Sequence, residues 1–355
     1  MTSDPQAATA AYIDSLGADA LAKAAAYTAG NHWLLLWGLM VSGLVTWLIV
    51  RSGLLERVSA KFARRGPHLR AFAVGVVFFL VSALVTLPWS LYEEWWRERG
   101  YGRTSQPLGD FLGQDAIGIL ISTLLAALFV VGVYALIRRT GQRWWLWSGE
   151  VRNALVVMAQ ESGVPTDRIF VFDGSRQSNN FTANVSGLGG SARIAISDVA
   201  FKGASLDEVK AVTGHEIGHY VLGHVWRGVI VISIMSILFF FLADRLFPRF
   251  ARAFGSRATV ADPAGLPVMV YIVSLFAVLA QPVFNTLSRI DETESDRYSL
   301  ETVNLPDALA SALVKTAEYR NPRPNRAEEL VFYTHPSVER RVRMAMEWKS
   351  KHAAE

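Results

Sequence analysis

Long apolar runs alternate with shorter polar segments along this chain of 355 residues. A helix needs roughly 20 apolar residues to cross the hydrocarbon core of a membrane. Five runs meet this length, at about 32–50, 71–89, 116–137, 226–243 and 268–287. The alternative, that they are buried helices of a soluble core, is disfavoured because five such runs occur in one chain. The pattern predicts a mainly α, polytopic integral membrane protein with about five transmembrane helices.

The polar segment at 148–224 has the pattern of a small α+β domain. A helix is expected at about 150–162, and the stretches "RIFVFDG" and "ARIAISD" alternate like strands. The Asn/Ser/Gly-rich residues between these stretches indicate a hairpin or an edge strand. The sequence "SLDE" then predicts a capping box at the start of a helix, with Ser205 as the N-cap and Glu208 three residues later.

Composition supports lipid contact, because 51% of the residues are hydrophobic and only 19% are charged. The net charge of +4 is modest and reflects Arg-rich loops, which are typical of membrane orientation; no nucleic-acid partner is expected. The chain has no cysteine, which excludes disulfides, thiolate metal ligands and a cysteine nucleophile. Residues 1–30 lack the basic start of a signal peptide, so none is expected.

Loop charge predicts an orientation in the membrane. The loop at 51–70 and the residues after the third span are basic and are expected in the cytoplasm, whereas the acidic loop at 90–115 is expected outside. The N-terminus would then lie outside and segment 148–224 inside. The Arg-rich loop at 244–262 disagrees with this scheme, and alternation of the spans is given the greater weight.

The main chemical signal is the His-Glu-x-x-His pattern in "TGHEIGHYVLGH". On a helix, His215 and His219 share a face and can bind one metal ion, and Glu216 beside them can accept a proton from an attacking water. Neutral imidazoles suit Zn²⁺, and a catalytic zinc needs one more protein ligand. Two surface histidines beside a salt-bridging glutamate would give the same pattern.

Four acids just after the fifth span compete for the third position, namely Asp291, Glu292, Glu294 and Asp296. Glu292 and Asp296 are four residues apart and share a helix face, whereas Glu294 points almost the opposite way. A ligand together with a carboxylate that holds a zinc histidine needs such a pair. A solvated acidic cluster is the alternative. Because two spans separate these acids from His219, both segments reach the same side of the membrane.

These residues together resemble the type I CAAX prenyl endopeptidases, which are membrane gluzincin metalloproteases related to the bacterial heat-shock membrane zinc proteases. The shared pattern is His-Glu-x-x-His, a downstream histidine and then Ser-Arg-x-x-Glu-x-x-x-Asp. The resemblance implies one Zn²⁺ per chain, held by His215, His219 and Glu292. It implies supporting roles around these ligands for Asp296, His224 and Arg289.

Two further stretches extend the resemblance. The stretch "FDGSRQSNNFTANVSG" is similar to an edge strand along which substrate backbone lies, which implies substrate contacts at Thr182, Ala183 and Asn184. The stretch "YTHPSVERRV" resembles a His-Pro element. It implies that His335 stabilises the oxyanion and that Arg340 supports the site electrostatically. The full eukaryotic enzymes have two more spans before the zinc motif.

The predicted organisation has five parts. These are an N-terminal extramembrane helix at 1–31, a membrane domain of three spans at 32–147, the α+β segment with the zinc helix at 148–224, two further spans at 225–287 and C-terminal catalytic helices at 288–355. The predicted function is a zinc-dependent membrane endopeptidase acting on peptides or membrane proteins, prenylated ones among them, in processing or quality control.

The Ala- and Arg-rich composition indicates a bacterial inner membrane, with the active site on the cytoplasmic side. One alternative is a non-catalytic membrane scaffold or chaperone that retains the protease fold. A metal transporter is disfavoured, because the spans carry no acidic residue or histidine along a pathway.

Overall fold

The structure is a computed structural model that describes residues 4–140, 169–172, 183–186, 193–197, 204–316 and 320–352. Within them, five helices are long and apolar enough to cross a membrane, which confirms the predicted number of spans. They are α2 (Ala18–Ser52), α4 (Pro67–Ser90) with its continuation to Gly100, α6 (Leu108–Thr140), α10 (His224–Phe254) and α11 (Leu266–Val303). The continuation of α4 is a π-helical turn, η2 (Leu91–Trp96), followed by α5 (Arg97–Gly100).

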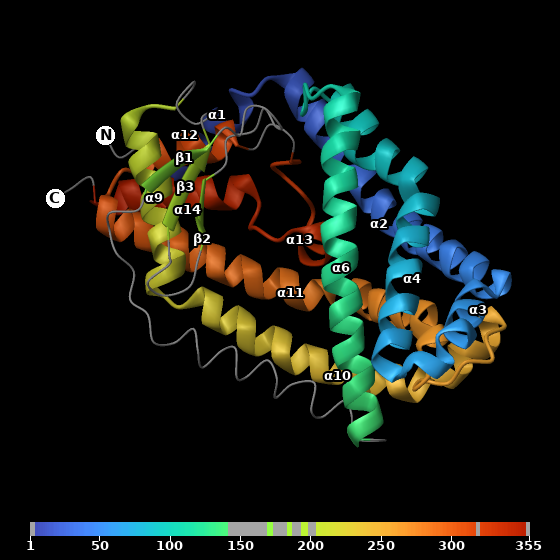
Figure 1. Ribbon diagram of the computed structural model, residues 1–355. Helices are drawn as coiled ribbons and strands as arrows, with labels where there is room; N and C mark the ends of the chain where they lie inside the picture. Colours follow the sequence, from blue (N-terminus) through green and yellow to red (C-terminus); the bar gives the residue numbers. More distant parts are fainter. Residues whose placement is uncertain are drawn as a thin grey trace.

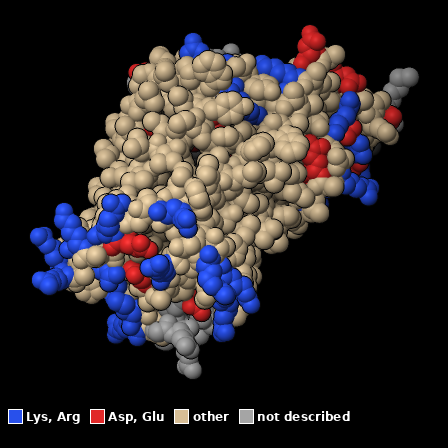
Figure 2. All heavy atoms as spheres, turned by 90° about the vertical axis from the view of Figure 1, so that its right-hand side faces the viewer, with Lys and Arg blue, Asp and Glu red and all other residues tan. Residues whose placement is uncertain are grey.

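The surface of the long helices is suited to lipid. Figure 2 shows charged side chains gathered towards two ends of one face, with a broad field of uncharged side chains between them. Large apolar side chains such as Leu125 and Phe129 on α6 are 63% and 65% exposed. A surface of this kind is stable in a bilayer and unfavourable in water.

Small residues let α4 and α6 approach closely. A Cβ at Gly75 on α4 would lie 3.2 Å from the Cα of Ala127 on α6, so the two backbones are nearly in contact. Close approach of this kind drives helix association in membranes, where burial of apolar surface adds little. Buried side chains of α4, α10 and α11, including Phe78, Phe247 and Ile272, fill the rest of this core.

The long helices meet at a loop end, which consists of residues 51–70, the last turns of α6 and residues 255–265. Here α3 (Leu54–Lys61), η1 (Ala63–Arg65) and η5 (Pro263–Gly265) pack near one another. Arg70 forms a salt bridge with Asp262 at 3.0 Å, and the Tyr134 hydroxyl donates to the Asp262 carbonyl at 3.3 Å. Arg138, near the end of α6, lies 3.3 Å from His68.

A second group of elements forms the α9 end of the molecule (Figure 1). It contains α1 (Pro5–Asp14), α9 (Leu206–Val221), α12 (Pro306–Lys315) and α14 (Val338–His352), whereas α13 (Arg326–Phe332) packs against α11 nearer the middle of the molecule. Buried side chains from α1, α11, α12 and α14 make its core, and Ile13, Leu300 and Leu309 are at most 2% exposed. Burying a Leu or Ile side chain contributes roughly 1.5–3 kcal/mol, so this core fixes α12 and α14 against the end of α11.

Three strands are described beside α9. β3 (Arg193–Ser197) lies between β1 (Ile169–Phe172), with which it is parallel, and β2 (Ala183–Ser186), with which it is antiparallel. The predicted strands are thus present, and among the described strands β2 is an edge of the sheet. The helix expected at about 150–162 lies outside the described residues.

The predicted side of the zinc helix is wrong, although the first three spans alternate between the two ends as predicted. The prediction assumed that the third span ends on the side of the zinc helix and that the N-terminus lies opposite. Instead α6 ends at the loop end, whereas α1 packs against α12 and α14 at the α9 end. The error arose because the zinc helix was assumed to lie at the end of the bundle that α6 reaches. The two basic loops at 51–70 and 244–262, which alternation had separated, lie at the same end.

The predicted five-part division remains a prediction, but two of its boundaries fall inside continuous helices. Helix α2 starts at Ala18 and runs through the boundary at 31/32. Helix α11 runs through the boundary at 287/288, so one rigid element joins the bilayer to the segment that carries the acids.

Candidate metal centre

The helix that carries the His-Glu-x-x-His pattern is fixed at its first turn. Ser205 accepts from the backbone N–H of Glu208, and the Glu208 carboxylate accepts from the N–H of Ser205, which is the predicted capping box. Glu208 also accepts from Ser311 and Lys315 of α12, and burial raises its pKa less than these contacts lower it. The same residue therefore starts α9 and ties it to α12.

Two glycines set the distance between α9 and α11. A Cβ at Gly218 would lie 3.1 Å from the Cα of Ser295, and a Cβ at Gly214 would lie 2.5 Å from a methyl group of Val303. The hydroxyl of Ser299 adds a hydrogen bond of 2.7 Å to the carbonyl of Ala211. Because these glycines alternate with the two histidines of the motif, the histidines come within reach of the acids on α11.

The three predicted metal ligands meet at this contact. Nε2 of His215 lies 3.1 Å from Nε2 of His219, and each lies 3.2 Å from a carboxylate oxygen of Glu292. Zn–N and Zn–O bonds of about 2.0–2.1 Å place the ligand atoms of a tetrahedral site roughly 3.3 Å apart. The separations and the donor set of two imidazoles and one carboxylate therefore fit a zinc ion.

The electrostatics also favour a cation between these residues. Among the described residues, Glu292 Oε2 has no donor in hydrogen-bonding geometry, although it is buried. Burial by itself would lower the pKa of His215, but the carboxylates of Asp296 and Glu292 beside the ring outweigh burial and raise the pKa to about 9. The two carboxylates thus stabilise positive charge at His215, and a metal ion would satisfy the orphaned oxygen.

Asp296 orients the first histidine from behind. Its carboxylate is fully buried, lies 2.8 Å from Nδ1 of His215 and accepts from Arg341 at 2.6 and 2.7 Å. Arg341 also comes within 3.4 Å of Glu292. This chain of contacts fixes the His215 ring so that Nε2 faces the proposed ion.

The predicted role of Arg340 needs correction, because Arg341 is the arginine that reaches the metal group. The Arg340 side chain is 61% exposed and pairs with Glu329 at 3.0 Å. Adjacent residues of a helix point about 100° apart, and the face of α14 that meets α11 carries Arg341. The motif "ERRV" offered two arginines, and only the packing of α14 distinguishes them.

His335 lies at the metal group as predicted from the resemblance, with Nε2 3.3 Å from Glu292. Burial lowers its pKa to about 4, so at neutral pH the ring is uncharged and keeps one N–H. Arg289, also expected to support the ligands, contacts a different part of the described structure. Its guanidinium donates to the carbonyls of Glu329 and Tyr333, at 2.8 and 2.5 Å, and so holds the segment that leads to His335.

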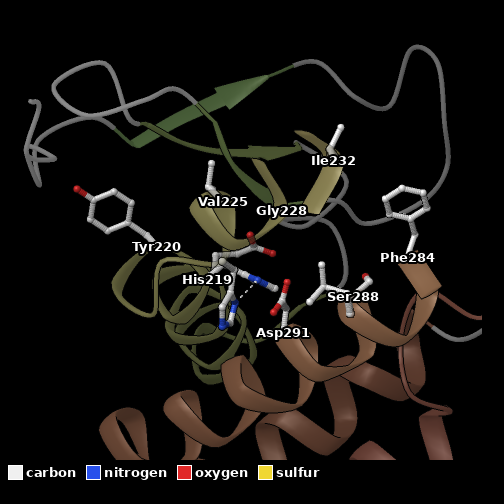
Figure 3. A pocket seen from close by; sticks show the side chains of 11 residues that line it. His219, Tyr220, Val225, Gly228, Ile232, Phe284, Ser288 and Asp291 are labelled. Carbon is white, nitrogen blue, oxygen red and sulfur yellow. Dashed lines mark hydrogen bonds between the residues drawn. The ribbon is translucent and has the colours of Figure 1, made fainter. Parts of the chain in front are cut away.

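An elongated pocket of about 400 Å³ opens beside the metal group, between α10 and α11 (Figure 3). Glu216 and His219 line one part of it. Val225 and Ile232 of α10 and Phe284 of α11 line the remainder, and Ile232 and Phe284 lie at the end farther from His219. The pocket therefore has a polar part, next to Glu216 and His219, and an apolar part.

The predicted substrate strand lies beside the motif helix. Residues 183 and 184 belong to β2, which contacts α9, whereas Thr182 lies outside the described residues. An edge strand can pair with an extended peptide, and substrate contact along this strand stays a prediction.

Comparison with known families identifies the fold and the chemistry. The model of peptidase family M48 matches residues 147–349, and a model described as CAAX prenyl protease N-terminal, five membrane helices, matches residues 3–159. The chain belongs to peptidase family M48. The M48 assignment, with five helices that can span a membrane, makes it a membrane metalloendopeptidase. The non-catalytic scaffold is not favoured.

Relatives of this M48 peptidase span bacteria and eukaryotes. An uncharacterized metalloprotease, YhfN of Bacillus subtilis, is 24% identical over 92% of this chain and 85% of that protein. CAAX prenyl protease 1 of Saccharomyces cerevisiae is 30% identical over 56% of this chain and 48% of its own length. The human CAAX prenyl protease 1 homolog is 26% identical over 74% of this chain and 71% of its own length. The crystal structure of S. mikatae Ste24p has a TM-score of 0.74 and 17% identity over 97% of this chain and 96% of that one, which shows the fold.

Sequence reasoning missed two residues of the M48 site. Arg341 is one of them. Glu294 is the other, because its helix face was expected to point away, yet it lies 3.0 Å from Nε2 of His224. With His224 and Asp291 it forms a second group of potential metal-binding atoms. Arg227, in the first turn of α10, gave no signal in the sequence that it would meet these acids.

Proposed function

We propose that this M48 peptidase uses one zinc ion per chain, held by His215, His219 and Glu292, and that Glu216 transfers the proton in peptide-bond hydrolysis. One observation carries the proposal. Three potential ligand side chains from two helices approach one another to 3.1–3.2 Å beside a pocket that Glu216 also lines. A bound zinc ion supplies Lewis acidity towards the scissile carbonyl and lowers the pKa of water.

The side chains around the ion divide the remaining work. Glu216 accepts a proton from the attacking water and returns it to the leaving amine. His335, as a neutral ring, donates a hydrogen bond to the carbonyl oxygen as negative charge develops on it. Asp296 and Arg341 keep the His215 ring oriented throughout.

The substrate is a peptide that carries an apolar group near the cleaved bond, in a membrane-associated or prenylated protein. The apolar half of the pocket, with Ile232 and Phe284, supports this choice. So do the names of the relatives in yeast and human, CAAX prenyl protease 1 and its homolog. The peptide backbone would extend along β2 past residues 183 and 184, with Thr182 as a third contact.

The test compares wild type with Glu216→Gln on a farnesylated CAAX peptide and on the same peptide without the lipid. The variant is expected to bind zinc as wild type does and to lose cleavage by at least 10²-fold, because the proton acceptor is gone. Glu301→Gln, an exposed change on α11, is the control and should remain active. Full activity of Glu216→Gln would refute the mechanism. Equal cleavage of the two peptides would show that the enzyme does not recognise the prenyl group.

We also propose that the site faces the cytoplasm from a bacterial inner membrane. Basic residues flank both ends of the helices, at Arg64 in the loop end and at Lys351 in the α9 end, so charge alone does not choose the side. The absence of cysteine makes the test simple. In intact cells a membrane-impermeant maleimide should label Arg64→Cys and spare Lys351→Cys. The opposite labelling pattern would show that the metal centre faces away from the cytoplasm.

A further inference from the structure

The two histidines of the proposed zinc site differ in what lies behind them. Nδ1 of His215 contacts a carboxylate, Asp296, directly at 2.8 Å. Nδ1 of His219 instead lies 3.0 Å from Nδ1 of His224, and Nε2 of His224 lies 3.0 Å from Glu294. The second histidine therefore reaches its carboxylate through one additional ring.

The turn between α9 and α10 makes this additional step possible. Gly223 has a φ of 70°, a left-handed conformation that glycine adopts without strain. Helix α10 begins at the next residue, so His224 folds back against His219, with the ring centroids 5.0 Å apart. His224 is 5% exposed, and Ser295 of α11 packs against it with its hydroxyl 3.4 Å from Nδ1.

An arginine holds the far end of each path. Arg341 binds Asp296 behind His215, and Arg227 binds Glu294 behind His219 at 3.0 Å. Arg227 also donates to Asp291, the next acid along the same face of α11. Each metal-binding histidine is thus connected to a carboxylate whose position an arginine fixes.

The tautomers along the second path are determined by its ends. When Nε2 of His219 binds a metal, Nδ1 carries the proton and donates it to Nδ1 of His224. His224 must then carry its own proton on Nε2, which donates to Glu294. Both rings stay neutral, and the carboxylate stabilises the polarised chain.

We propose that Glu294 and Arg227 are positioning residues that orient His219 for metal binding through His224. The inference rests on the proposed function, because it assumes that His219 is a ligand. The proposal concerns the contact of His224 with Glu294, which lies on the opposite side of α11 from Glu292.

A second metal ion is the competing explanation, since His224, Asp291 and Glu294 could also hold one. Arg227 argues against it. Its guanidinium contacts both carboxylates, so a cation bound there would lie beside a fixed positive charge and would have to displace it. The same arginine is what a hydrogen-bonded relay needs to fix Glu294.

The experiment measures zinc affinity by chelator competition and the visible spectrum of the Co²⁺-substituted full-length protein in detergent. Glu294→Ala should bind zinc about 10- to 100-fold more weakly than wild type and should alter the Co²⁺ spectrum, as loss of an outer hydrogen-bond partner does. Glu294→Gln should be intermediate, because its amide oxygen still accepts from His224. Glu301→Gln, two turns along the same helix and exposed, should behave as wild type.

The outcomes separate the relay from its alternatives. Wild-type zinc affinity in a folded Glu294→Ala variant would overturn the proposal, and thermal denaturation of the metal-free proteins establishes that the variant is folded. If Glu294→Ala fails to fold, the Arg227→Gln variant is measured in the same way and must also bind zinc more weakly. Two metal ions per wild-type chain, falling to one in Glu294→Ala, would refute the relay in favour of a second ion. A wild type that binds no zinc would refute the proposed function itself.

Discussion

Replacing Asp296 with Asn should damage stability and metal binding at the same time. The carboxylate is completely buried and accepts two hydrogen bonds from Arg341, at 2.6 and 2.7 Å, and contacts His215 at 2.8 Å. Asparagine keeps one acceptor oxygen, but its NH₂ group faces a guanidinium that can only donate. The charge of Arg341 then remains buried with its main partner neutralised.

The magnitude follows from these contacts. Breaking a buried ion pair by removing one charge costs about 3–5 kcal/mol. The one charge-assisted hydrogen bond that asparagine cannot accept, worth about 1.5–3 kcal/mol, accounts for a large part of this cost. For the metal, a weakened contact behind His215 should lower zinc affinity about 10- to 100-fold, or roughly 1.4–2.7 kcal/mol.

A double variant separates the two effects. Asp296→Asn combined with Arg341→Met removes both charges, so the buried guanidinium no longer penalises the folded state. Stability should recover by more than half, because replacing a whole buried pair is often nearly neutral. Zinc affinity should stay low, because the carboxylate behind His215 is still missing.

Thermal denaturation of the metal-free protein in detergent measures the first effect, and chelator competition measures the second. Arg340→Met is the matched control. That arginine is exposed and its ion pair with Glu329 should be worth less than about 1 kcal/mol. If Arg340→Met and Arg341→Met cost the same, or if Asp296→Asn keeps wild-type zinc affinity, the role given to this buried pair is wrong.

Further changes test the surrounding features. Gly218→Ala should weaken zinc binding, because the added Cβ would lie 3.1 Å from the Ser295 backbone. The control Gly118→Ala on α6 places its Cβ in open space and should bind zinc as wild type does. Equal zinc affinities of the two variants would contradict the close packing of α9 and α11. Phe284→Ala should lower kcat/KM by about 10-fold or more for a peptide with a large apolar group near the cleaved bond, and only slightly for a peptide with alanine at that position. An equal loss for both peptides would exclude a role of Phe284 in specificity. His335→Ala should lower kcat about 10²- to 10³-fold with zinc retained, and an unchanged kcat would remove it from the reaction. Zinc at 100 times its Kd should stabilise the wild type by about 2.7 kcal/mol, seen as a higher Tm than after chelation; an unchanged Tm would mean that the ion does not favour the folded state.

The sequence was sufficient for features that depend on local chemistry. Apolar run length predicted five spans, and the capping box predicted the start of α9. Four-residue spacing predicted that His215 and His219 share a face, and the structure brings their Nε2 atoms to 3.1 Å. It could not predict that α9 lies at the opposite end of the bundle from the end of α6, because loop charge is a weak signal when basic residues flank both ends.

The acids on α11 show why part of the site was hidden. Helical spacing correctly separated Glu292 from Glu294, which lie 200° apart around the helix. The sequence did not show what Glu294 would contact in the second direction. Helix α11 is packed on several sides, and the start of α10, with Arg227, lies there.

A central helix therefore gives its two polar faces two different partners. One face supplies Glu292, the proposed ligand, and Asp296 behind His215, and the opposite face supplies Glu294 behind His224. Buried or half-buried acids in such a helix each need a cation or a donor, and α9, α10 and α14 provide them. A sequence fixes the directions in which these side chains leave the helix, but only packing decides what lies there. For this protein the packing turns an acidic segment that resembled a solvated helix end into the supports of both metal-binding histidines.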